Sequence, residues 1–344
     1  MKVAVSFFVA QKKQDEVTVY NDELLWLSVV IDELSLYYTT MATILITGGT
    51  GLVGKALGQA LLEKGYRVII LSRQGDQKSS LANLSYASWN VEQQTIDREA
   101  IAKADYIIHL AGAGVADKRW TQKRKQEIVD SRVYSSKLIV DSLKLIPNKV
   151  KAVVSASAIG WYGADPVMPH PIPFTEVVPA DNEFLGITCK QWEESIEPVT
   201  ESGIRLVKLR TGIVLSNNGG ALKEFLKPLQ FGMAAILGKG KQIISWIHID
   251  DLVKMYITAI ENESMNGVYN AVAPNPVSNK ELTLQLAKAR KKFFIPIHVP
   301  SFVLKIMLGE MSVEVLKSTT VSSEKIQQAG VAFNFPDISS ALQK

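Results

Sequence analysis

A glycine-rich segment near residue 50 has the residue types and spacing that most directly imply a chemistry. Glycines stand at positions 48, 51 and 54, after the apolar run 44–47 and before a helix-compatible stretch. This spacing allows a tight turn, close approach of the backbone to a pyrophosphate, and close packing of the following helix. The N–H groups at the start of that helix would face the phosphates. The segment predicts a dinucleotide site, with a purely structural turn as the alternative. The predicted contacts are Gly48, Thr50, Gly51, Leu52, Val53 and Gly54.

The end of the second predicted strand indicates which dinucleotide binds. An NAD site usually places an acidic residue there, to hold the ribose hydroxyls. This chain instead has Ser72 and Arg73 at that position, with no carboxylate before Asp76. Arginine forms paired charge-assisted hydrogen bonds to phosphate, so the two residues suit a 2′-phosphate. The sequence therefore predicts NADP rather than NAD, with a surface arginine at a strand end as the alternative explanation.

These motifs need a scaffold in which strands and helices alternate. Strands are predicted at 44–47, 67–72, 106–110, 150–155 and 204–209, and helical stretches at 54–64, 120–145 and 184–202. Such alternation is typical of a parallel sheet that is covered by helices on both faces. The predicted fold class is therefore α/β, with a doubly wound parallel sheet of the Rossmann type. The proline-rich, acidic stretch 162–183 is expected to form a loop over the carboxyl edge of the sheet, where ligands bind in such folds.

Three parts of the chain are expected. Residues 1–40 do not fit the alternating pattern, and we expect a loosely attached extension or a start-site artefact, since Met41 opens the first strand–turn–helix unit. Residues 41–275 form the predicted NAD(P)-binding domain. Residues 276–344 form a smaller, mostly helical lobe, with helices expected at 279–291, 301–317 and 322–329.

Composition excludes several classes of site and partner. The single cysteine, Cys189, rules out an intrachain disulfide framework, and the four histidines show no metal-ligand spacing, so no metal is expected. The net charge of +4 is mild, and the basic run 288–292 ends a predicted helix, where cations complement the dipole. We therefore expect no nucleic-acid partner. The apolar run 24–36 is too short and too charged to span a bilayer, so we expect no membrane partner and a cytoplasmic location, with a targeting role of residues 1–40 left open.

Several ordered motifs from residue 41 to the C-terminus resemble one protein family. They are TGGTGLVG at 47–54, HLAG at 109–112, ADKRWT at 116–121 with SR at 131–132, SASAIGWYG at 155–163, RTGIVL at 210–215, WIHIDD at 246–251 and LGEM at 308–311. Together they resemble the extended short-chain dehydrogenase/reductase superfamily. Within it they are most similar to the atypical, NAD-dependent epimerase/dehydratase-like branch that is called the epimerase family proteins.

This resemblance implies further cofactor contacts and partners. Ser72 and Arg73 would flank the adenosine phosphate, Glu127 and Arg132 would reach the cofactor from the long helix, and Val214 would lie near the nicotinamide. The strand-end motif would lie along the dinucleotide through Leu110, Ala111 and Gly112. Members of the superfamily often dimerise through helix pairs, so the resemblance implies a homodimer and a small-molecule substrate.

The catalytic pair of the superfamily, Tyr-x-x-x-Lys, is missing. The tyrosine normally exchanges a proton and the lysine lowers its pKa, whereas the matching helix here places Leu185 and Cys189 in these positions. Ser157 stands where the family has its serine and could polarise a substrate carbonyl, or it could cap the turn after its strand. Tyr162 is the nearest phenol and the candidate acid, or it could pack in the loop.

Other reactive side chains have ordinary structural explanations. We expect Cys189 to be a buried, inert thiol rather than a nucleophile. Asp250 and Asp251 could supply a base, but we expect them to cap the helix that follows. Arg119 and Arg124 could hold an anionic group, although a solvated helix face is the simpler interpretation.

The sequence predicts an NADP(H)-dependent oxidoreductase or epimerase of the extended short-chain type, which transfers a hydride on an unidentified small substrate. A sugar-nucleotide-like substrate is suggested by the family name alone. The alternative function is an NADPH-binding sensor or scaffold without turnover, which the missing Tyr-x-x-x-Lys pair favours. A polar pocket would support the enzyme, and an exposed apolar patch on the C-terminal lobe would support the scaffold.

Overall fold

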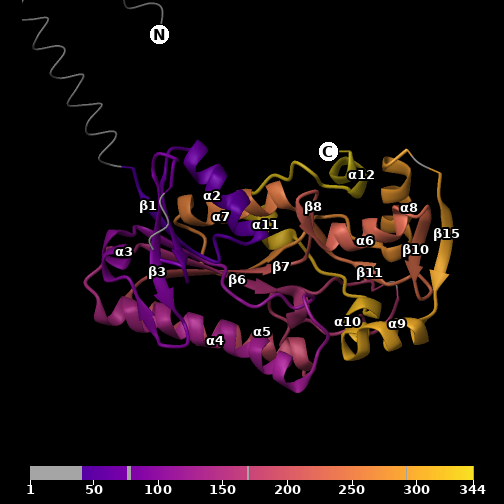
Figure 1. Cartoon of the computed structure of the whole chain (residues 1–344), viewed down its shortest axis with the longest axis horizontal. Coiled ribbons are helices and arrows are strands. Elements are labelled where there is room, and N and C mark those ends of the chain that lie inside the picture. Colours follow the sequence, from indigo (N-terminus) through magenta and orange to yellow (C-terminus); the bar gives the residue numbers. More distant parts are fainter. Residues whose placement is uncertain (1–40, 76–78, 169, 292, 344) are drawn as a thin grey trace, which may run out of the picture. The chain divides into compact units, whose positions relative to one another are not determined.

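A large, mostly parallel sheet organises residues 42–344, which form one compact unit (Figure 1). The computed structural model describes residues 41–75, 79–168, 170–291 and 293–343. Within these residues the sheet has eight strands, all parallel except for the last pair. This arrangement confirms the predicted doubly wound α/β fold. In spatial order the strands are β13 (Gly267–Ala271), β7 (Arg205–Thr211), β6 (Ala152–Ala158), β5 (Tyr106–His109), β1 (Thr43–Thr47), β2 (Arg67–Ser72), β3 (Leu84–Asn90) and β4 (Thr95–Ile96).

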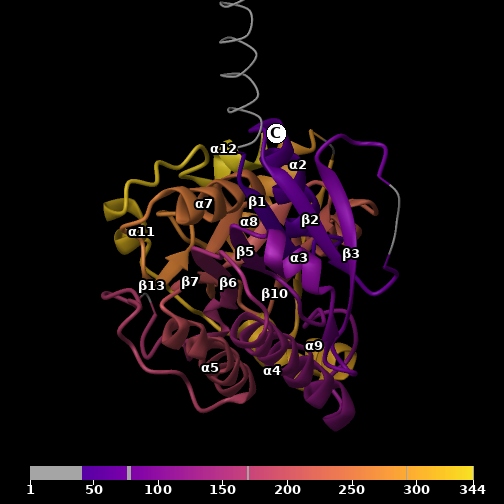
Figure 2. The ribbon, with the colours of Figure 1, turned by 90° about the vertical axis from the view of Figure 1, so that its left-hand side faces the viewer.

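Helices cover both faces of this sheet (Figure 2). Helices α2 (Leu52–Glu63) and α7 (Ile249–Glu261) pack on one face, and α3 (Arg98–Lys103), α4 (Gln122–Leu145) and α5 (Phe184–Ile196) pack on the other. Successive residues of β1 point to opposite faces of the sheet. Ile44 and Ile46 belong to the hydrophobic core under α2 and α7, and Leu45 belongs to the core under α3 and α4. Strands buried on both faces have continuous apolar runs, which is why they were visible in the sequence.

The five predicted strands and the three predicted helices of the nucleotide-binding region are confirmed, with ends shifted by up to three residues. The predicted helix 184–202 is α-helical to Ile196 and continues as a 3-10 helix, η2 (Glu197–Ser202). The sequence analysis missed β3 and β13. Strand β3 is only partly buried, and β13 lies at the sheet edge and includes the buried Asn270, so neither has a long apolar run.

The described residues after 276 are mostly helical, as predicted. The helices are α8 (Asn279–Ala289), α9 (Ser301–Leu308), α10 (Ser312–Leu316), α11 (Glu324–Gln328) and α12 (Ile338–Leu342). The predicted helix 301–317 is interrupted at Gly309, where φ is +61° and a Cβ would lie 2.6 Å from Nε of Arg119. A 3-10 turn, η3 (Gly309–Met311), joins α9 to α10.

Small sheets connect the two expected halves of the unit. Strand β10 (Met233–Leu237) pairs in parallel with β15 (Ile295–Val299), and β11 (Ile243–Ile244) pairs with β14 (Val277–Ser278). Strand β8 (Ile213–Ser216) lies between β12 (Trp246–His248) and β9 (Gly219–Gly220) in a third small sheet. Helix α6 (Ala221–Leu229) follows β9 in the chain, and the 3-10 helix η1 (Ile159–Trp161) follows β6. Residues on both sides of position 275 thus share sheets, and the domain boundary there stays a prediction.

The start of α7 differs from the expectation. His248 is the N-cap residue, and its Nδ1 accepts a hydrogen bond from the backbone N–H of Asp250 at 3.2 Å. The predicted cap of Asp250 and Asp251 is therefore wrong. The carboxylate of Asp251 is fully buried and accepts the backbone N–H groups of Asn334 (2.7 Å) and Phe335 (2.9 Å). Asp251 thus fixes the C-terminal tail against α7.

Two glycines one turn apart in α2 provide a matched stability test. A Cβ at Gly54 would lie 2.4 Å from the carbonyl oxygen of Gly48, whereas a Cβ at Gly58 would meet no atom within 4 Å. We expect Gly54→Ala to destabilise the fold by about 1–3 kcal/mol, because backbone must move to admit the methyl group. Gly58→Ala should stabilise it by about 0.5–1 kcal/mol, because alanine loses less entropy in a helix. Urea unfolding measures both, and equal midpoints for the two variants would contradict the expectation.

Candidate functional site

The loops after β1 and β5 meet at the carboxyl edge of the sheet, where the strand order reverses. In doubly wound folds this crevice is the ligand site. Gly48 has φ +68°, and a Cβ on it would lie 2.9 Å from the carbonyl carbon and oxygen of Leu110. Glycine is thus required at this contact for two independent reasons, its left-handed conformation and the missing side chain.

The N-terminus of α2 opens into the same crevice edge. Gly51 is its N-cap residue, and among the described residues no side chain caps the helix and none in its first turn is acidic. Gly54 is buried against the Gly48 carbonyl, while Thr50 and Gly51 are exposed and Leu52 and Val53 are half-buried. A helix start of this kind favours anion binding, because its N–H groups and dipole face outward.

The hydroxyl of Thr47 joins the two loops. Its Oγ1 accepts the backbone N–H groups of Leu110 (3.0 Å) and Ala111 (3.1 Å), and it lies 2.8 Å from Nδ1 of His109. Since its lone pairs are occupied, Thr47 donates its proton to Nδ1, so His109 is neutral and protonated on Nε2. Nε2 lies 3.3 Å from the hydroxyls of both Ser135 and Ser136 on α4.

The predicted adenosine end lies at the carboxyl end of β2. Ser72 is buried, and its Oγ accepts the backbone N–H of Gln74 at 3.2 Å, while Arg73 is exposed. Asp76, the first carboxylate after this strand, lies outside the described residues. Strands β1 and β2 are parallel neighbours, so Arg73 and the glycine loop share one edge of the sheet.

Helix α4 shapes the segment after β5. Nη1 of Arg132 donates to the carbonyl oxygens of Ala113 (3.0 Å) and Ile128 (2.8 Å). A Cβ at Gly112 would lie 3.2 Å from the guanidinium carbon of Arg132, so the glycine makes room for this packing. Burial lowers the pKa of Arg132, and its guanidinium lies 4.9 Å from the ring of Trp192.

Glu127 and Arg124 lie nearby on α4 and differ in exposure. Glu127 is exposed and forms an ion pair with Arg124 at 2.8 Å, a contact that lowers the pKa of the carboxyl group. Arg124 is buried and donates to the carbonyl oxygen of Gly114. The expected solvated helix face is therefore wrong for Arg124, and Arg119 is exposed but lies in the loop before α4.

The hairpin β8–β9 lies against the start of α2. A Cβ at Gly220 would lie 2.9 Å from Cδ2 of Leu52, so the hairpin backbone packs directly against the Leu52 side chain. Val214, the residue expected near the nicotinamide, is half-buried in β8 and pairs with Ile247 of β12. The structure thus brings Val214 and the glycine loop to the same region through Leu52.

Ser157 and Tyr162 belong to one buried polar network. The Ser157 hydroxyl donates to Oε1 of Glu193 at 2.6 Å, and Glu193 accepts Nε (2.8 Å) and Nη2 (3.1 Å) of Arg210. Nη1 of Arg210 donates to the Tyr162 hydroxyl at 3.1 Å, and that hydroxyl donates to Oδ1 of Asn270 at 2.7 Å. All five side chains are buried. One guanidinium therefore links the two residues that were predicted to be catalytic.

Burial also determines the protonation of nearby groups. It raises the pKa of Tyr162 to about 12 although Arg210 opposes the shift, and it raises the pKa of the Cys189 thiol to about 12. Both groups keep their protons at neutral pH, which agrees with an inert thiol. Leu185 and Cys189 both face Gly160, where a Cβ would lie 3.1 Å from Cβ of Leu185 and 3.5 Å from the sulfur. The helix surface that holds the superfamily's catalytic pair is thus apolar here.

Sequence reasoning missed Glu193, Arg210 and Asn270. Each is polar and buried, and each has partners on a different secondary-structure element. One signal was present, since Arg210 directly follows the predicted strand 204–209 of a buried sheet, and a buried charge requires a partner. In the described part of the chain no cluster of three or more His, Cys, Asp or Glu residues could hold a metal ion, and no helix is long and apolar enough to cross a membrane.

The buried network predicts a graded loss of stability. Glu193→Gln leaves Arg210 buried without its counter-charge and should cost about 3–5 kcal/mol. Ser157→Ala removes one hydrogen bond to a carboxylate and should cost about 1.5–3 kcal/mol. Glu194→Gln is the control, because its pair with Lys190 is exposed and spans 3.9 Å, so the change should stay within about 0.5 kcal/mol. Chemical unfolding would refute the network if Glu193→Gln matched this control.

His109 predicts a pH dependence of stability. Burial lowers its pKa from 6.5 to about 4. Above pH 6.5 both the folded and the unfolded chain hold it neutral. As the pH falls from 6.5 to about 4 only the unfolded chain takes up the proton, so about 3 kcal/mol of stability is lost in this window. His109→Gln should flatten unfolding free energy against pH in this window, whereas the exposed control His298→Gln should not; identical slopes would disprove a neutral His109.

Comparison with known proteins identifies the family. A model of the NAD dependent epimerase/dehydratase family matches residues 44–271, and a domain of unknown function, DUF1731, matches residues 299–344. An epimerase family protein of Staphylococcus saprophyticus is 36% identical over 301 residues, covering 87% of this chain and 97% of the relative. One from Staphylococcus aureus is 36% identical over 306 residues, covering 88% and 98%.

Solved structures agree in fold. Human epimerase family protein SDR39U1 with NADPH is 28% identical and aligns with a TM-score of 0.77 over 88% of this chain and 98% of the human chain. UDP-glucuronic acid 4-epimerase from Bacillus cereus, in complex with UDP-glucuronic acid and NAD, has a TM-score of 0.72 at 19% identity over 88% and 96%, a likeness of fold alone. The motifs, the sheet topology and these matches together show that this chain belongs to the NAD-dependent epimerase/dehydratase family, in its branch of epimerase family proteins.

Proposed function

We propose that this protein is an NADP(H)-dependent oxidoreductase or epimerase of the extended short-chain type, acting on an unidentified small substrate. The observation that carries the proposal is the crevice at the switch point of the sheet, where Gly48 touches Leu110 beside an uncapped helix start. A pyrophosphate would fit there, because the glycine turn leaves room for it and the N–H groups at the start of α2 have no side-chain cap among the described residues. The bound nicotinamide would supply or accept a hydride, and the chain would orient it.

The proposed cofactor contacts come from four segments. The glycine loop and helix start would hold the pyrophosphate, the β2 end the adenosine phosphate, the segment after β5 the dinucleotide, and β8 the nicotinamide end. Arg132 would support the β5 segment through its bonds to Ala113, and the exposed Glu127 would reach the cofactor from the side. The residues are Gly48, Thr50, Gly51, Leu52, Val53, Gly54, Ser72, Arg73, Leu110, Ala111, Gly112, Glu127, Arg132 and Val214.

The preference for NADP rests on Arg73. Its side chain is exposed beside the buried Ser72 at the end of β2, where a fixed guanidinium could bind a 2′-phosphate. The human relative with NADPH supports this choice, while the bacterial sugar-nucleotide epimerase holds NAD. A sugar-nucleotide substrate is part of the proposal only as the class on which that structural neighbour acts.

The catalytic roles of Ser157 and Tyr162 stay predictions. The proton of Ser157 is donated to Glu193, so polarising a substrate carbonyl would require Ser157 to exchange that partner. Tyr162 keeps its proton at neutral pH, which suits an acid, but its hydroxyl is engaged by Arg210 and Asn270 and its side chain is fully buried. Turnover through Tyr162 would therefore require the loop around it to open.

A second function, an NADPH-binding sensor or scaffold without turnover, is favoured by two observations. Leu185 and Cys189 make the expected catalytic surface apolar. The C-terminal lobe also exposes large apolar side chains on β15 and α9. Both functions require the same cofactor site, and they differ in whether bound NADPH is consumed when carbonyl or sugar-nucleotide substrates are supplied.

Calorimetric titration of the full-length protein with NADPH and NADH tests the shared part of both functions. We expect tighter binding of NADPH than NADH. Arg73→Ala should weaken NADPH binding roughly 10- to 100-fold, through loss of a charge-assisted contact, and leave NADH unchanged. Arg67→Ala is the matched control, an exposed arginine about 20 Å away at the other end of β2.

Either of two results would contradict the proposal. If neither nucleotide binds, the glycine loop is structural and both functions fall. If Arg73→Ala and Arg67→Ala behave alike, the protein does not recognise a 2′-phosphate through Arg73.

A further inference from the structure

The two-stranded sheet β10–β15 has one apolar face without a covering element in the described structure. The register places Met233, Ala235 and Leu237 beside Ile295, Ile297 and Val299. These residues share a face because side chains alternate along a strand. On this face Met233, Ile295 and Ile297 are exposed. On the opposite face Ala234 and Ile236 of β10 are at most 1% exposed, whereas Pro296 and His298 of β15 are exposed.

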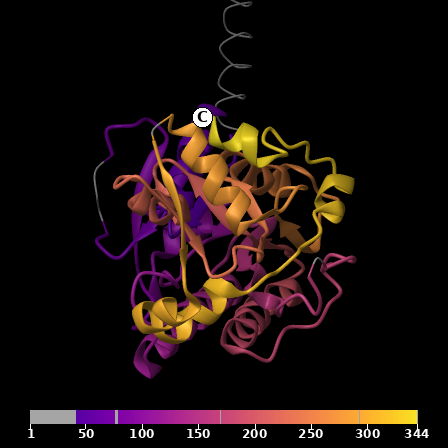
Figure 3. The ribbon, with the colours of Figure 1, turned by 90° about the vertical axis from the view of Figure 1, so that its right-hand side faces the viewer.

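Exposed aromatic side chains also lie in the chain before β10 and on both sides of β15. Phe231 and Phe293 precede the two strands and are 78% and 84% exposed, close together because the backbone N–H of Ile295 bonds to the carbonyl oxygen of Gly232. Beyond β15, Phe302 (65%) and Ile306 (71%) are one turn apart on α9. Figure 3 shows the orange strand β15 and the helix α9 on the side of the unit that faces the viewer.

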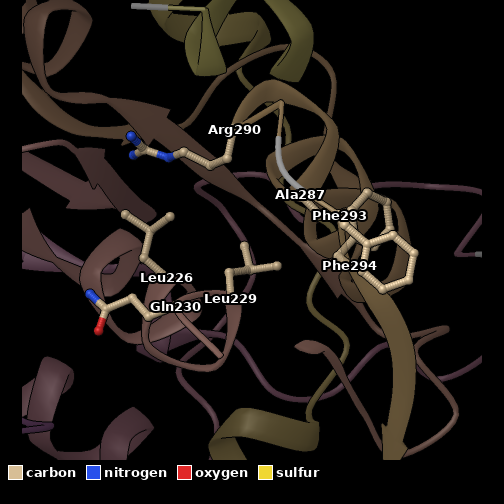
Figure 4. Close-up of a pocket in the computed structure, with 7 residues that line it drawn as sticks. All are labelled: Leu226, Leu229, Gln230, Ala287, Arg290, Phe293 and Phe294. Atoms are coloured by element: carbon tan, nitrogen blue, oxygen red, sulfur yellow. The ribbon is translucent and has the colours of Figure 1, made fainter. Parts of the chain in front are cut away.

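A shallow pocket opens beside Phe293, between α6 and the end of α8 (Figure 4). Leu226 and Leu229 line it from α6, Phe293 and Phe294 lie at one end, and the Arg290 side chain extends at the other. An apolar pocket thus lies next to the guanidinium of Arg290, which donates to Oδ1 of Asn217 at 3.2 Å.

Basic residues outnumber acidic ones around this surface, although Glu224, Glu281 and Glu310 lie just outside its two segments and Glu224 pairs with Lys227. Neither segment that builds it, 225–249 or 282–309, contains an aspartate or glutamate. Together they hold eight basic residues, which exceeds the net charge of +4 for the whole chain. The basic residues are Lys227, Lys239, Lys241, Lys288, Arg290, Lys291 and Lys305, and Lys292, which lies outside the described residues. The remainder of the chain is therefore net acidic, and the basic charge is concentrated in these segments.

Two features disfavour a second copy of the chain on this face. A two-fold contact would bring two predominantly basic surfaces together, which costs free energy by like-charge repulsion. Pairing between edge strands is also hindered. Ile295 and Val299 bond toward β10, so the intervening Pro296 directs its backbone to the open edge, where it has no N–H to donate.

We propose that the face formed by β10, β15 and α9 docks on the surface of an anionic phospholipid bilayer. Exposed phenylalanines flanked by lysine and arginine suit the boundary between headgroups and acyl chains, where the rings lose contact with water and the cations meet phosphate. This is peripheral contact and needs no spanning helix. It departs from the expectation of no membrane partner, which rested on the lack of a spanning segment.

Co-sedimentation of the full-length protein with vesicles tests the proposal. We expect binding to phosphatidylcholine vesicles that contain about a third phosphatidylglycerol, little binding to pure phosphatidylcholine, and a loss of binding as salt is raised. Phe231→Ser/Phe293→Ser/Phe302→Ser and Arg290→Glu/Lys291→Glu should each weaken binding at least about tenfold. Leu145→Ser, a change at a 74% exposed residue on α4, is the matched control and should bind as the parent does.

Thermal unfolding and NADPH titration of each variant test whether misfolding causes the loss of vesicle binding. The vesicle measurement needs no cofactor, so its outcome is independent of the proposed function. Absence of binding to anionic vesicles at low salt would overturn the proposal, as would equal binding of the parent and both surface variants. A dimer of the parent that becomes monomeric in the phenylalanine variant would also overturn it, because a second copy would then be the occupant.

Discussion

The candidate site depends on the close approach of two backbone segments at the centre of the sheet. The turn after β1 can touch the segment after β5 because Gly48 lacks a side chain, and the hydroxyl of Thr47 fixes the contact by accepting two N–H groups of that segment. His109 extends the connection to the serines of α4. The floor of the crevice and the helix behind it therefore form one hydrogen-bonded unit, in which a shift of either loop would unpair buried polar groups.

A second constraint lies beside the crevice, on the face of α5 that meets β6. Leu185, Cys189 and Glu193 are spaced by four residues, so they lie on one side of the helix. The first two are apolar and face Gly160, and the third joins Arg210 in a buried ion pair. Burying such an ion pair costs desolvation free energy. Here hydrogen bonds to the hydroxyls of Ser157 and Tyr162 offset part of that cost. The polar member of these three residues thus lies one turn after Cys189, and its carboxylate is engaged within the protein.

The sequence was sufficient for the features that depend on local pattern. Buried parallel strands such as β1 and β2 have apolar runs, and the glycine spacing at 48, 51 and 54 specifies a turn and a helix start. Features that depend on distant partners were not predictable. Arg124 looks like a surface residue until its helix is seen to face the Gly114 carbonyl, and Asp251 looks like a cap until the C-terminal tail is in place. Strands β3 and β13 were missed because β3 is only partly buried and β13 has one neighbour and contains the buried Asn270, so neither has a long apolar run.

The buried carboxylate of Asp251 has a consequence for how this chain can vary. Its hydrogen-bond donors are the backbone groups of Asn334 and Phe335, within the segment that a separate family model matches. The pairing of β15 with β10 is a second contact between the residues after 275 and those before it. The C-terminal segment therefore completes the nucleotide-binding half instead of being an appended module. Because the donors are backbone N–H groups, a segment exchanged from a distant relative would keep this link only if its tail followed the same path past Asp251.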